Sequence, residues 1–336
     1  MTPANPVVCA VVATFNRKAL LRECLDALLR QTRPLDRVIV VDNACDDGTA
    51  EMFTRDYPTV DVVWLARNAG SSGGVHAGMA RALELGCDWV WVMDDDAEPA
   101  DDALEQLCKL TDRKGLAALA CLKTDTKGNT LHHHRGYFTF NDLPRRIIRP
   151  ITEAQLSPAQ PVEIDHASFV GLMVSTHAIR AVGLPDPRLF LQFDDVEYCI
   201  RLRRHGPILL APASRIVHKE QMPQGVRELR CLGRPYQSVP YPDFWKRYFV
   251  YRNFVWLSWR HAPGRLKALF GLLGLYGFLL IATMIHETRR FRRIFMLTCA
   301  FIDGLRGKFD NARPWWVLYG QRRSVAQPPD GRGGGE

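Results

Sequence analysis

Three consecutive carboxylates, Asp94 to Asp96, follow a short apolar stretch that begins at Trp89. The stretch is typical of a buried strand, and Pro99 follows soon after as a strand breaker. Side chains alternate between the two faces of a strand, so Asp94 and Asp96 are expected to point one way and Asp95 the other. Carboxylates this close repel each other unless a cation lies between them, and their oxygens suit Mg²⁺ or Mn²⁺. Such a cation would suit a diphosphate ligand; a solvated acidic turn is the alternative interpretation.

Strands and helices alternate through the first part of the chain, which indicates βαβ units and a parallel sheet. The expected strands are 6–14, 36–43, 60–65 and 89–93, and the expected helices are 17–32, 49–57 and 75–85. Ligands of open α/β sheets bind at the carboxyl ends of the strands. Polar residues stand at three such ends, at 14–17, 42–43 and 94–96, so the pattern predicts a nucleotide-binding edge.

The next stretch of the chain is less regular. The run from His132 to Arg135 offers metal ligands but is interpreted as the edge of a strand or loop. Residues 144–161 are expected to form a loop and residues 165–176 a strand. Asp194 and Asp195 stand where a helix is expected to begin, a position that favours carboxylates. His218 follows another expected strand, 208–217.

Length and cysteine usage limit the class of protein. A chain of 336 residues can hold one large domain with an appendage, or two modest domains. The nine cysteines are scattered and include no C-x-x-C pair. We therefore expect reduced thiols in a cytosolic protein, with neither a disulfide framework nor a zinc site.

Charge is distributed unevenly along the chain. Residues 1–200 carry 20 Lys and Arg against 28 Asp and Glu, whereas residues 201–336 carry 24 against 8. The first part is therefore acidic and the second strongly basic. A basic region of this kind indicates an anionic partner, which could be nucleic acid, a membrane surface or an anionic ligand.

Six motifs, in this order, carry a resemblance to a known family. They are VATFNR at 12–17, VVDN at 40–43 with DDGT at 46–49, NAG at 68–70 with nearby glycines, DDD at 94–96, FDDVEY at 193–198 with Arg201, and His218. Over about residues 7–220 the chain thereby resembles the family 2 glycosyltransferases of the GT-A fold. It is most similar to their galactofuranosyltransferase branch, with rhamnosyltransferases a close alternative. Ser71 and Ser72 depart from that branch, where Gly-Ala is more usual.

The resemblance implies a role for each motif. Asp94 and Asp96, with His218 as an imidazole ligand, are expected to hold Mn²⁺ or Mg²⁺. Asp195 is expected to be the general base, with Asp194 and Glu197 positioning the acceptor or the base. The residues expected to bind the nucleotide-sugar are Thr14, Asn16, Arg17, Asp42, Arg67, Asn68, Gly74 and Asp95. Asp42 is expected to accept a hydrogen bond from a uracil or thymine N–H, or else to cap the following turn.

The same resemblance implies a domain plan and a reaction. Residues 1–225 would be the α/β GT-A domain, a mostly parallel sheet flanked by helices, with a donor half at 1–115 and an acceptor half at 116–225. Residues 226–325 would be a helical, basic region and 326–336 a disordered tail. The enzyme would invert the anomeric centre and move galactofuranose from a nucleoside diphosphate to a saccharide, lipid-linked by analogy, in bacterial cell-envelope glycan synthesis. Transfer of rhamnose from dTDP-rhamnose is the alternative.

An uncharged stretch of 18 residues, 268–285, lies within the basic region. Its length is at the lower limit of a membrane-spanning helix, and arginines or lysines flank both of its ends. We expect an in-plane or re-entrant helix that places the protein at the cytoplasmic face of the plasma membrane, on anionic lipid. A helix buried in a C-terminal bundle is the alternative.

Three other functions are weaker interpretations. A nucleic-acid-binding protein would explain the basic region but not the acidic motifs, and no zinc finger, RNP or helix-turn-helix pattern is present. A sugar nucleotidyltransferase would share the fold, but a glycine-rich phosphate loop does not follow the first strand. A non-catalytic membrane protein would not need Asp94, Asp96, Asp195 and His218 together.

Overall fold

A computed structural model describes residues 6–142, 146–157, 160–219 and 225–320. The chain divides into two compact units. The first comprises Met1–Phe138, Ile148–Pro187 and Asp194–Glu220; the second comprises Thr139–Ile147, Arg188–Phe193 and Gln221–Glu336. The first unit has two hydrophobic clusters and the second has one of its own. The tail expected at 326–336 lies outside the described residues.

The first unit alternates strands and helices. Its strands are β1 (Val8–Thr14), β2 (Arg37–Asp42), β3 (Asp61–Trp64), β4 (Trp89–Asp94), β5 (Ala97–Pro99), β6 (Ala118–Thr124), β7 (Arg135–Phe138), β8 (Ile148–Pro150), β9 (Val162–Ile164), β10 (His166–Ala167), β11 (Leu172–Ser175) and β12 (Ile208–His218). Its α-helices are α1 (Lys18–Leu29), α2 (Thr49–Asp56), α3 (Gly70–Glu84), α4 (Ala103–Cys108), α5 (Thr176–Val182) and α6 (Asp194–His205).

Within the described residues, a nine-stranded sheet has the order β3-β2-β1-β4-β11-β6-β12-β5, with β9 paired to β12. The strands β1 to β4 are parallel, as expected, whereas β11 lies antiparallel between β4 and β6. Two antiparallel steps restore the direction, so β6 and its parallel neighbour β12 run the same way as β4. The carboxyl ends of β1, β2, β4, β6 and β12 therefore meet at one edge of the sheet.

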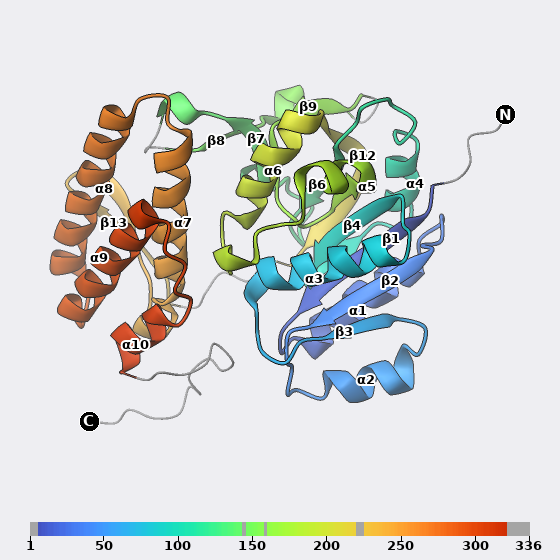
Figure 1. Ribbon diagram of the computed structural model, residues 1–336, viewed down its shortest axis with the longest axis horizontal. Coiled ribbons are helices and arrows are strands. Elements are labelled where there is room, and N and C mark those ends of the chain that lie inside the picture. Colours follow the sequence, from blue (N-terminus) through green and yellow to red (C-terminus); the bar gives the residue numbers. More distant parts are fainter. Residues whose placement is uncertain (1–5, 143–145, 158–159, 220–224, 321–336) are drawn as a thin grey trace. The chain divides into compact units, whose positions relative to one another are not determined.

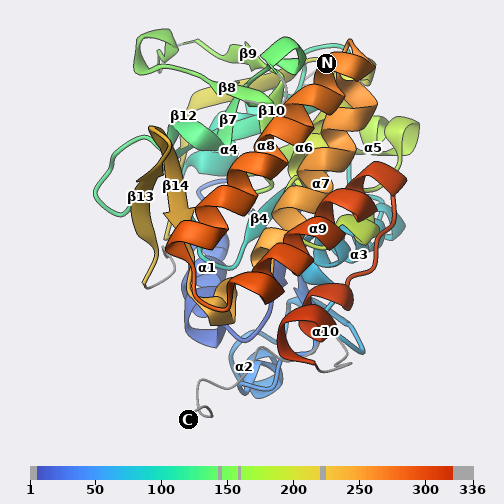
Figure 2. The ribbon, with the colours of Figure 1, turned by 90° about the vertical axis from the view of Figure 1, so that its left-hand side faces the viewer.

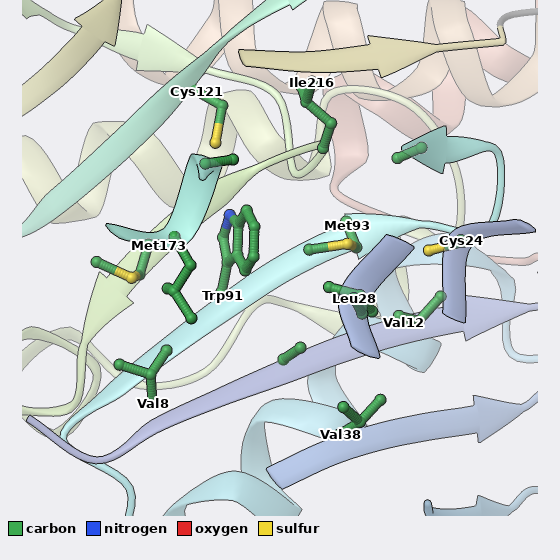
Figure 3. Close-up of a cluster of buried hydrophobic side chains, with 14 of the residues drawn as sticks. Val8, Val12, Cys24, Leu28, Val38, Trp91, Met93, Cys121, Met173 and Ile216 are labelled. Carbon is green, nitrogen blue, oxygen red and sulfur yellow. The ribbon is translucent and has the colours of Figure 1, made fainter. Parts of the chain in front are cut away.

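Helices cover both faces of this sheet (Figure 1). Residues of α1, α2 and α4 join one buried cluster with the strands, and residues of α3, α5 and α6 join the other. In the first cluster, Trp91 and Met93 of β4 lie near Val12 of β1 and Leu28 of α1 (Figure 3). Burial of one such side chain contributes about 1.5–3 kcal/mol. The packing holds β4 firmly beside β1, and with it the carboxylates at the end of β4.

The glycine-rich segment after β3 is helical, although the helix was expected to begin only at residue 75. The helix α3 begins at Gly70, whose φ of +75° suits glycine. A Cβ on Gly74 would lie 2.8 Å from Ala13 Cβ, and one on Gly78 would lie 2.3 Å from Val11 Cγ1. The glycines therefore let α3 approach β1 closely. Close packing outweighs the low helix propensity of glycine, which is why the prediction failed here.

Two expectations for the middle of the chain also need correction. The strand expected at 165–176 is divided into β10 and β11, because Gly171 turns the chain at a φ of +80° against the side chain of Cys121. The loop expected at 144–161 contains β8, which pairs with β7. The partners of β10 and β11, which are β7 and β4, lie far away in sequence, so local patterns do not indicate this division.

Cys9 and Cys87 form a disulfide, with their Cα atoms 6.0 Å apart. The expectation of reduced thiols is wrong for this pair. The two cysteines are 78 positions apart, but the parallel pairing of β1 with β4 places Val8 opposite Trp89 and brings them together. The other seven cysteines are free, as expected.

The second unit is mainly helical, as expected. It contains the hairpin β13 (Arg227–Cys231) and β14 (Arg234–Ser238) and the helices α7 (Lys246–His261), α8 (Arg265–His286), α9 (Arg290–Arg306) and α10 (Arg313–Tyr319), shown in Figure 2. The apolar faces of α7, α8 and α9 share one cluster with the hairpin. Tyr236 of β14 contacts Phe278 of α8, with 6.4 Å between the ring centroids.

The uncharged stretch seen in the sequence lies in α8. Among the described residues, α8 is the one helix long and apolar enough to cross a membrane, a property that core helices of soluble proteins can share. Only 28% of its most apolar stretch is buried. Phe270 and Ile285 are 70% and 62% exposed. This exposure argues against the interpretation of α8 as a helix buried in a bundle.

Candidate functional site

Polar residues stand where five parallel strands end at the same edge. Thr14 of β1 pairs with Asp42 of β2, and Ala13 of β1 pairs with Asp94 of β4. On the other side of β11, Lys123 near the end of β6 pairs with Ile216, close to the end of β12. Residues that are distant in sequence are thereby brought to one edge, as ligand sites in open α/β sheets require.

Asp94, Asp96 and His218 form a compact group at this edge. One ligand atom from each lies within 4.8 Å of the others, and His218 Nε2 is 3.0 Å from Asp96 Oδ1. Burial, and then repulsion from Asp96, raises the pKa of Asp94 to about 6. Burial alone would lower the pKa of His218, but the two carboxylates raise it above its usual value. Carboxylates suit Mg²⁺ and Mn²⁺, and histidine is a common metal ligand, so this donor set fits the expected cation.

Asp95 and Asp96 are linked by the guanidinium of Arg17. Arg17 Nη1 lies 3.1 Å from Asp95 Oδ1 and 2.9 Å from Asp96 Oδ2. Thr14 Oγ1 donates a hydrogen bond of 2.8 Å to Asp95 Oδ2. Because β4 ends at Asp94, the alternation of strand side chains does not continue, and the expectation that Asp95 and Asp96 point in opposite directions is wrong. The structure does bring Thr14, Arg17 and the carboxylates together.

Asp42 and Asn16 both organise loops beside this group. Asp42 Oδ1 accepts a hydrogen bond of 2.7 Å from the backbone N–H of Cys45, so it does cap the following turn. Its Oδ2 is buried and has no partner among the described residues. Asn16 exchanges two hydrogen bonds with Asp46, of 2.6 and 2.8 Å. Asp42 therefore caps the turn through one oxygen, and its other oxygen is not used by that turn.

The remaining donor-side residues have more local surroundings. Asn68 Oδ1 accepts a hydrogen bond of 2.8 Å from Gly70 N, at the start of α3. A Cβ on Gly74 would lie 2.8 Å from Asn43 Nδ2, so this glycine allows close approach of α3 to the strand end. Arg67 is exposed and makes no ion pair within the described parts of the chain.

Asp194 and Asp195 begin α6, as expected, and their surroundings drive their pKa values apart. Burial, and then the charge of Asp195, raises the pKa of Asp194 well above its usual range. Burial would also raise the pKa of Asp195, but His166 lowers it below the usual value. His166 Nε2 lies 3.4 Å from Asp195 Oδ2. The surroundings therefore favour the ionised form of Asp195 and the protonated form of Asp194.

Glu197 is held by its own helix. Arg201 donates two hydrogen bonds to its carboxylate, of 2.8 and 2.7 Å. The same guanidinium donates to the carbonyl oxygens of Val182 and Leu184, at 2.7 and 3.1 Å. Glu197 therefore takes part in joining α6 to the end of α5, a contact that the sequence motif does not reveal.

Sequence reasoning missed a group of basic residues at the same edge. Lys123 is 1% exposed, and its Nζ donates to Ser168 Oγ. Burial and the nearby charge of Arg135 lower the pKa of Lys123 to about 7. His134 Nδ1 lies 3.1 Å from Ser168 Oγ, and the ring of His134 is 5.2 Å from that of His218. The run from His132 to Arg135, which we interpreted as the edge of a strand or loop, is the sequence feature that could have indicated this basic group.

The sequence comparisons agree with these motifs. The family described as "Glycosyl transferase family 2" matches residues 9–177. Galactofuranosyltransferase GlfT1 of Mycolicibacterium smegmatis is 34% identical over 255 residues, which cover 74% of this chain and 81% of that protein. dTDP-rhamnosyl transferase RfbF of Shigella flexneri is 24% identical over 312 residues, which cover 90% of this chain and 97% of that protein.

Solved structures are similar in fold. The mannosyltransferase PcManGT of Pyrobaculum calidifontis, in complex with GDP-Man and Mn²⁺, has a TM-score of 0.52 at 15% identity, covering 94% of this chain and 86% of that chain. GalNAc-T7 with UDP, GalNAc and Mn²⁺ has a TM-score of 0.51 at 15% identity, covering 84% of this chain but 57% of that one. The fold is thereby confirmed as GT-A. With the family match over half of the sequence and the 34% identity to GlfT1, this chain belongs to glycosyl transferase family 2 and is a glycosyltransferase.

Proposed function

We propose that the chain moves galactofuranose from UDP to a lipid-linked saccharide, with inversion at the anomeric carbon and with a divalent cation, in bacterial cell-envelope glycan synthesis. The observation that carries the proposal is the grouping of Asp94, Asp96 and His218 at the sheet edge. The charge of Asp94 also contributes to raising the pKa of Asp194, at the acidic start of α6. In the reaction, the acceptor oxygen forms a bond to the anomeric carbon. The bond from that carbon to the diphosphate oxygen breaks, and UDP leaves.

Asp94, Asp96 and His218 would hold Mn²⁺ or Mg²⁺. When bound, the cation neutralises charge that develops on the leaving diphosphate. Its positive charge would also relieve the repulsion that raises the pKa of Asp94. Arg17 places a further positive charge against Asp95 and Asp96, which keeps these carboxylates fixed.

Asp195 would take the proton of the acceptor hydroxyl. A general base must be ionised before it can accept a proton, and His166 favours the ionised form of Asp195. Burial raises the pKa of Asp194 and favours its protonated form, which would donate a hydrogen bond to the acceptor. A single base and no covalent intermediate are what an inverting transfer requires.

The donor nucleotide would lie beside β1, β2 and the start of α3. Asp42 keeps one buried oxygen free of its turn, and this oxygen would accept a hydrogen bond from the base N–H. Thr14, Asn16 and Arg17 order the neighbouring loop, and Asn68 and Gly74 allow α3 to begin close to it. Arg67 is exposed, and only its position in the motif supports a role at the phosphates or the base.

Two donors compete for this site. The 34% identity to a protein named galactofuranosyltransferase favours a UDP-linked sugar. The alignment with a dTDP-rhamnosyl transferase is weaker, at 24% identity, but covers 90% of this chain and keeps dTDP-rhamnose as the second candidate.

A thermal-shift measurement with UDP, dTDP, GDP and CMP, each with and without Mn²⁺, tests this function. UDP with Mn²⁺ is expected to raise the melting temperature, since a ligand at 100 times its Kd adds about 2.7 kcal/mol to the folded state. UDP without Mn²⁺ is expected to give a much smaller shift. A shift with dTDP alone would replace galactofuranose by rhamnose, and no shift with any nucleotide would contradict the donor site.

The second unit supplies the proposed link to a lipid-linked acceptor. The exposed apolar residues of α8 are Leu266, Phe270, Leu273, Ile281, Met284 and Ile285, and those of α9 are Phe291, Phe295, Ile302 and Leu305. Basic residues at 265, 267, 289, 290 and 292 lie in the first turns of these helices or directly before them. Apolar residues with flanking arginines suit the surface of an anionic bilayer, which supports peripheral attachment to the cytoplasmic face of the plasma membrane.

The double substitution Phe270→Glu and Ile285→Glu is expected to release the protein from vesicles of phosphatidylglycerol and phosphatidylcholine. Each change removes about 1.5–3 kcal/mol of apolar burial in the lipid and adds repulsion from anionic headgroups. Co-sedimentation measures the bound fraction. Trp64→Glu is the matched control, because Trp64 is 56% exposed on β3 of the first unit. Equal sedimentation of the double variant and the control would exclude this surface as the lipid contact.

A further inference from the structure

Arg135, at the start of β7, is a buried guanidinium without a partner. The residue is 1% exposed, and none of its three side-chain nitrogen atoms makes a hydrogen bond within the described parts of the chain. Burial lowers the pKa of Arg135 to about 10, which still leaves the group charged at neutral pH. The charge of Glu153 opposes this lowering, but it comes from an exposed side chain. An unpaired buried charge is strongly unfavourable, so Arg135 requires an anion.

The other buried arginines of the described chain do have partners. Arg252 of α7 donates to Leu189 O at 2.9 Å, and Arg293 of α9 lies 3.1 Å from the carboxylate of Glu287. Both guanidinium groups thereby stabilise contacts inside the second unit. Arg135 makes no contact of this kind with any described residue, so a role in holding the fold together does not explain why it is buried.

Lys123, near the end of β6, is a second buried cation in the same unit. It is 1% exposed, and its Nζ donates to the neutral hydroxyl of Ser168 rather than to a carboxylate. After burial, the charge of Arg135 is the next cause that lowers the pKa of Lys123, and the charges of Asp195 and Asp94 oppose it. The two cations are therefore close enough to repel each other, and an anion bound to both would remove this repulsion.

Backbone hydrogen bonds fix these residues beside the proposed metal site. Leu131 N donates to Lys123 O at 3.0 Å, so the chain returns to β6 before β7 begins. Ser168 N donates to His134 O at 2.9 Å, and the ring of His134 lies 5.2 Å from that of His218. His134 is partly exposed, so this group of residues lies near the surface of the first unit.

We propose that Lys123 and Arg135 form a binding site for phosphate oxygens next to the proposed metal site. A guanidinium donates two parallel hydrogen bonds to a phosphate, and a lysine adds a compact positive charge. Two ligands of the proposed reaction can present phosphate here. One is the diphosphate of the UDP-linked donor, and the other is the phosphate that joins an acceptor saccharide to its lipid. The inference deepens the proposed function and rests on it.

The variant Arg135→Met tests this site, with Lys123→Met as a second variant. Calorimetric titration of the full chain with UDP and Mn²⁺ measures donor binding. Titration with geranyl diphosphate in EDTA measures binding of a lipid phosphate without metal, and geraniol is the phosphate-free comparison. We expect at least one of the two diphosphates to bind both variants at least tenfold more weakly than wild type. Weaker binding of UDP would assign the site to the donor, and weaker binding of geranyl diphosphate alone would assign it to the lipid-linked acceptor.

Arg293→Met is the matched control, because Arg293 is 2% exposed but paired with Glu287. This substitution is expected to lower the melting temperature of the ligand-free protein and to leave the Kd of both diphosphates within twofold of wild type. Arg135→Met is expected to leave the ligand-free melting temperature unchanged or to raise it, since the folded protein loses an unpaired buried charge.

Weaker binding to Arg135→Met, at an unchanged or higher ligand-free melting temperature, would support the phosphate site. Unchanged binding of both diphosphates would overturn it, and so would a melting temperature lowered as far as in Arg293→Met. Failure of the proposed function would appear differently, as wild-type protein that transfers no sugar from UDP-galactofuranose. The titration with geranyl diphosphate does not depend on that transfer.

Discussion

Replacing Asp96 with alanine is expected to abolish sugar transfer while leaving the first unit folded. Asp96 lies 3.0 Å from His218 and 2.9 Å from Arg17, and with Asp94 it forms the group proposed to hold the cation. Loss of metal-assisted charge stabilisation removes several kcal/mol from the transition state, which corresponds to roughly 10³-fold in rate or more. The fold is expected to survive, because the substitution also removes the carboxylate that repels Asp94.

The measurement is sugar transfer from UDP-galactofuranose with Mn²⁺ or EDTA, together with thermal melting in the presence of UDP. The Asp96→Ala protein should lose both turnover and the Mn²⁺-dependent shift with UDP. Asp101→Ala is the control, since Asp101 is 63% exposed and forms only a loose ion pair with Arg30 at 3.7 Å. Full turnover of the wild-type protein in EDTA would exclude the metal role.

The parallel strands and their polar ends were predictable because their signals are local. Apolar runs of strand length, each ending in polar residues, stand at 6–14, 36–43 and 89–93, and all three became neighbouring strands of the sheet. The grouping of His218 with Asp94 and Asp96 followed only from the family resemblance. The physical link is the pair of antiparallel steps through β11, which turns β12 to run parallel to β4, and no local pattern indicates it.

The parts that could not be predicted depend on contacts between distant residues. The disulfide of Cys9 and Cys87 depends on the register of β1 against β4. The early start of α3 depends on the space that Gly74 and Gly78 leave against β1. In the sequence Lys123 does not differ from any other lysine. In the structure it is buried near the end of β6, and this burial lowers its pKa to about 7. These features need the three-dimensional neighbours, which sequence patterns of short range do not contain.

Replacing Asp195 with asparagine is expected to reduce turnover by about 10²- to 10⁴-fold, the usual contribution of a general base. Asparagine has nearly the same shape but cannot accept the acceptor proton. The cation group and the donor-side residues belong to other elements than α6, so the Kd for UDP with Mn²⁺ should stay within about twofold. Kinetics with saturating donor and calorimetric titration with UDP separate the two effects.

The Asp194→Asn variant is the decisive comparison, because it differs by one position in the same helix turn. The raised pKa of Asp194 favours the protonated, uncharged carboxyl, so an uncharged amide in its place should leave far more activity than Asp195→Asn does. Stability should differ too. A carboxyl whose pKa is raised by folding makes the folded protein less stable as the pH rises above the pKa of the unfolded state, about 3.9. Asparagine removes this effect. The melting temperature of Asp194→Asn, measured relative to wild type, should therefore be higher at pH 7 than at pH 4. If Asp194→Asn lost turnover and Asp195→Asn kept it, the base would be Asp194 and the electrostatic assignment of the pair would be reversed.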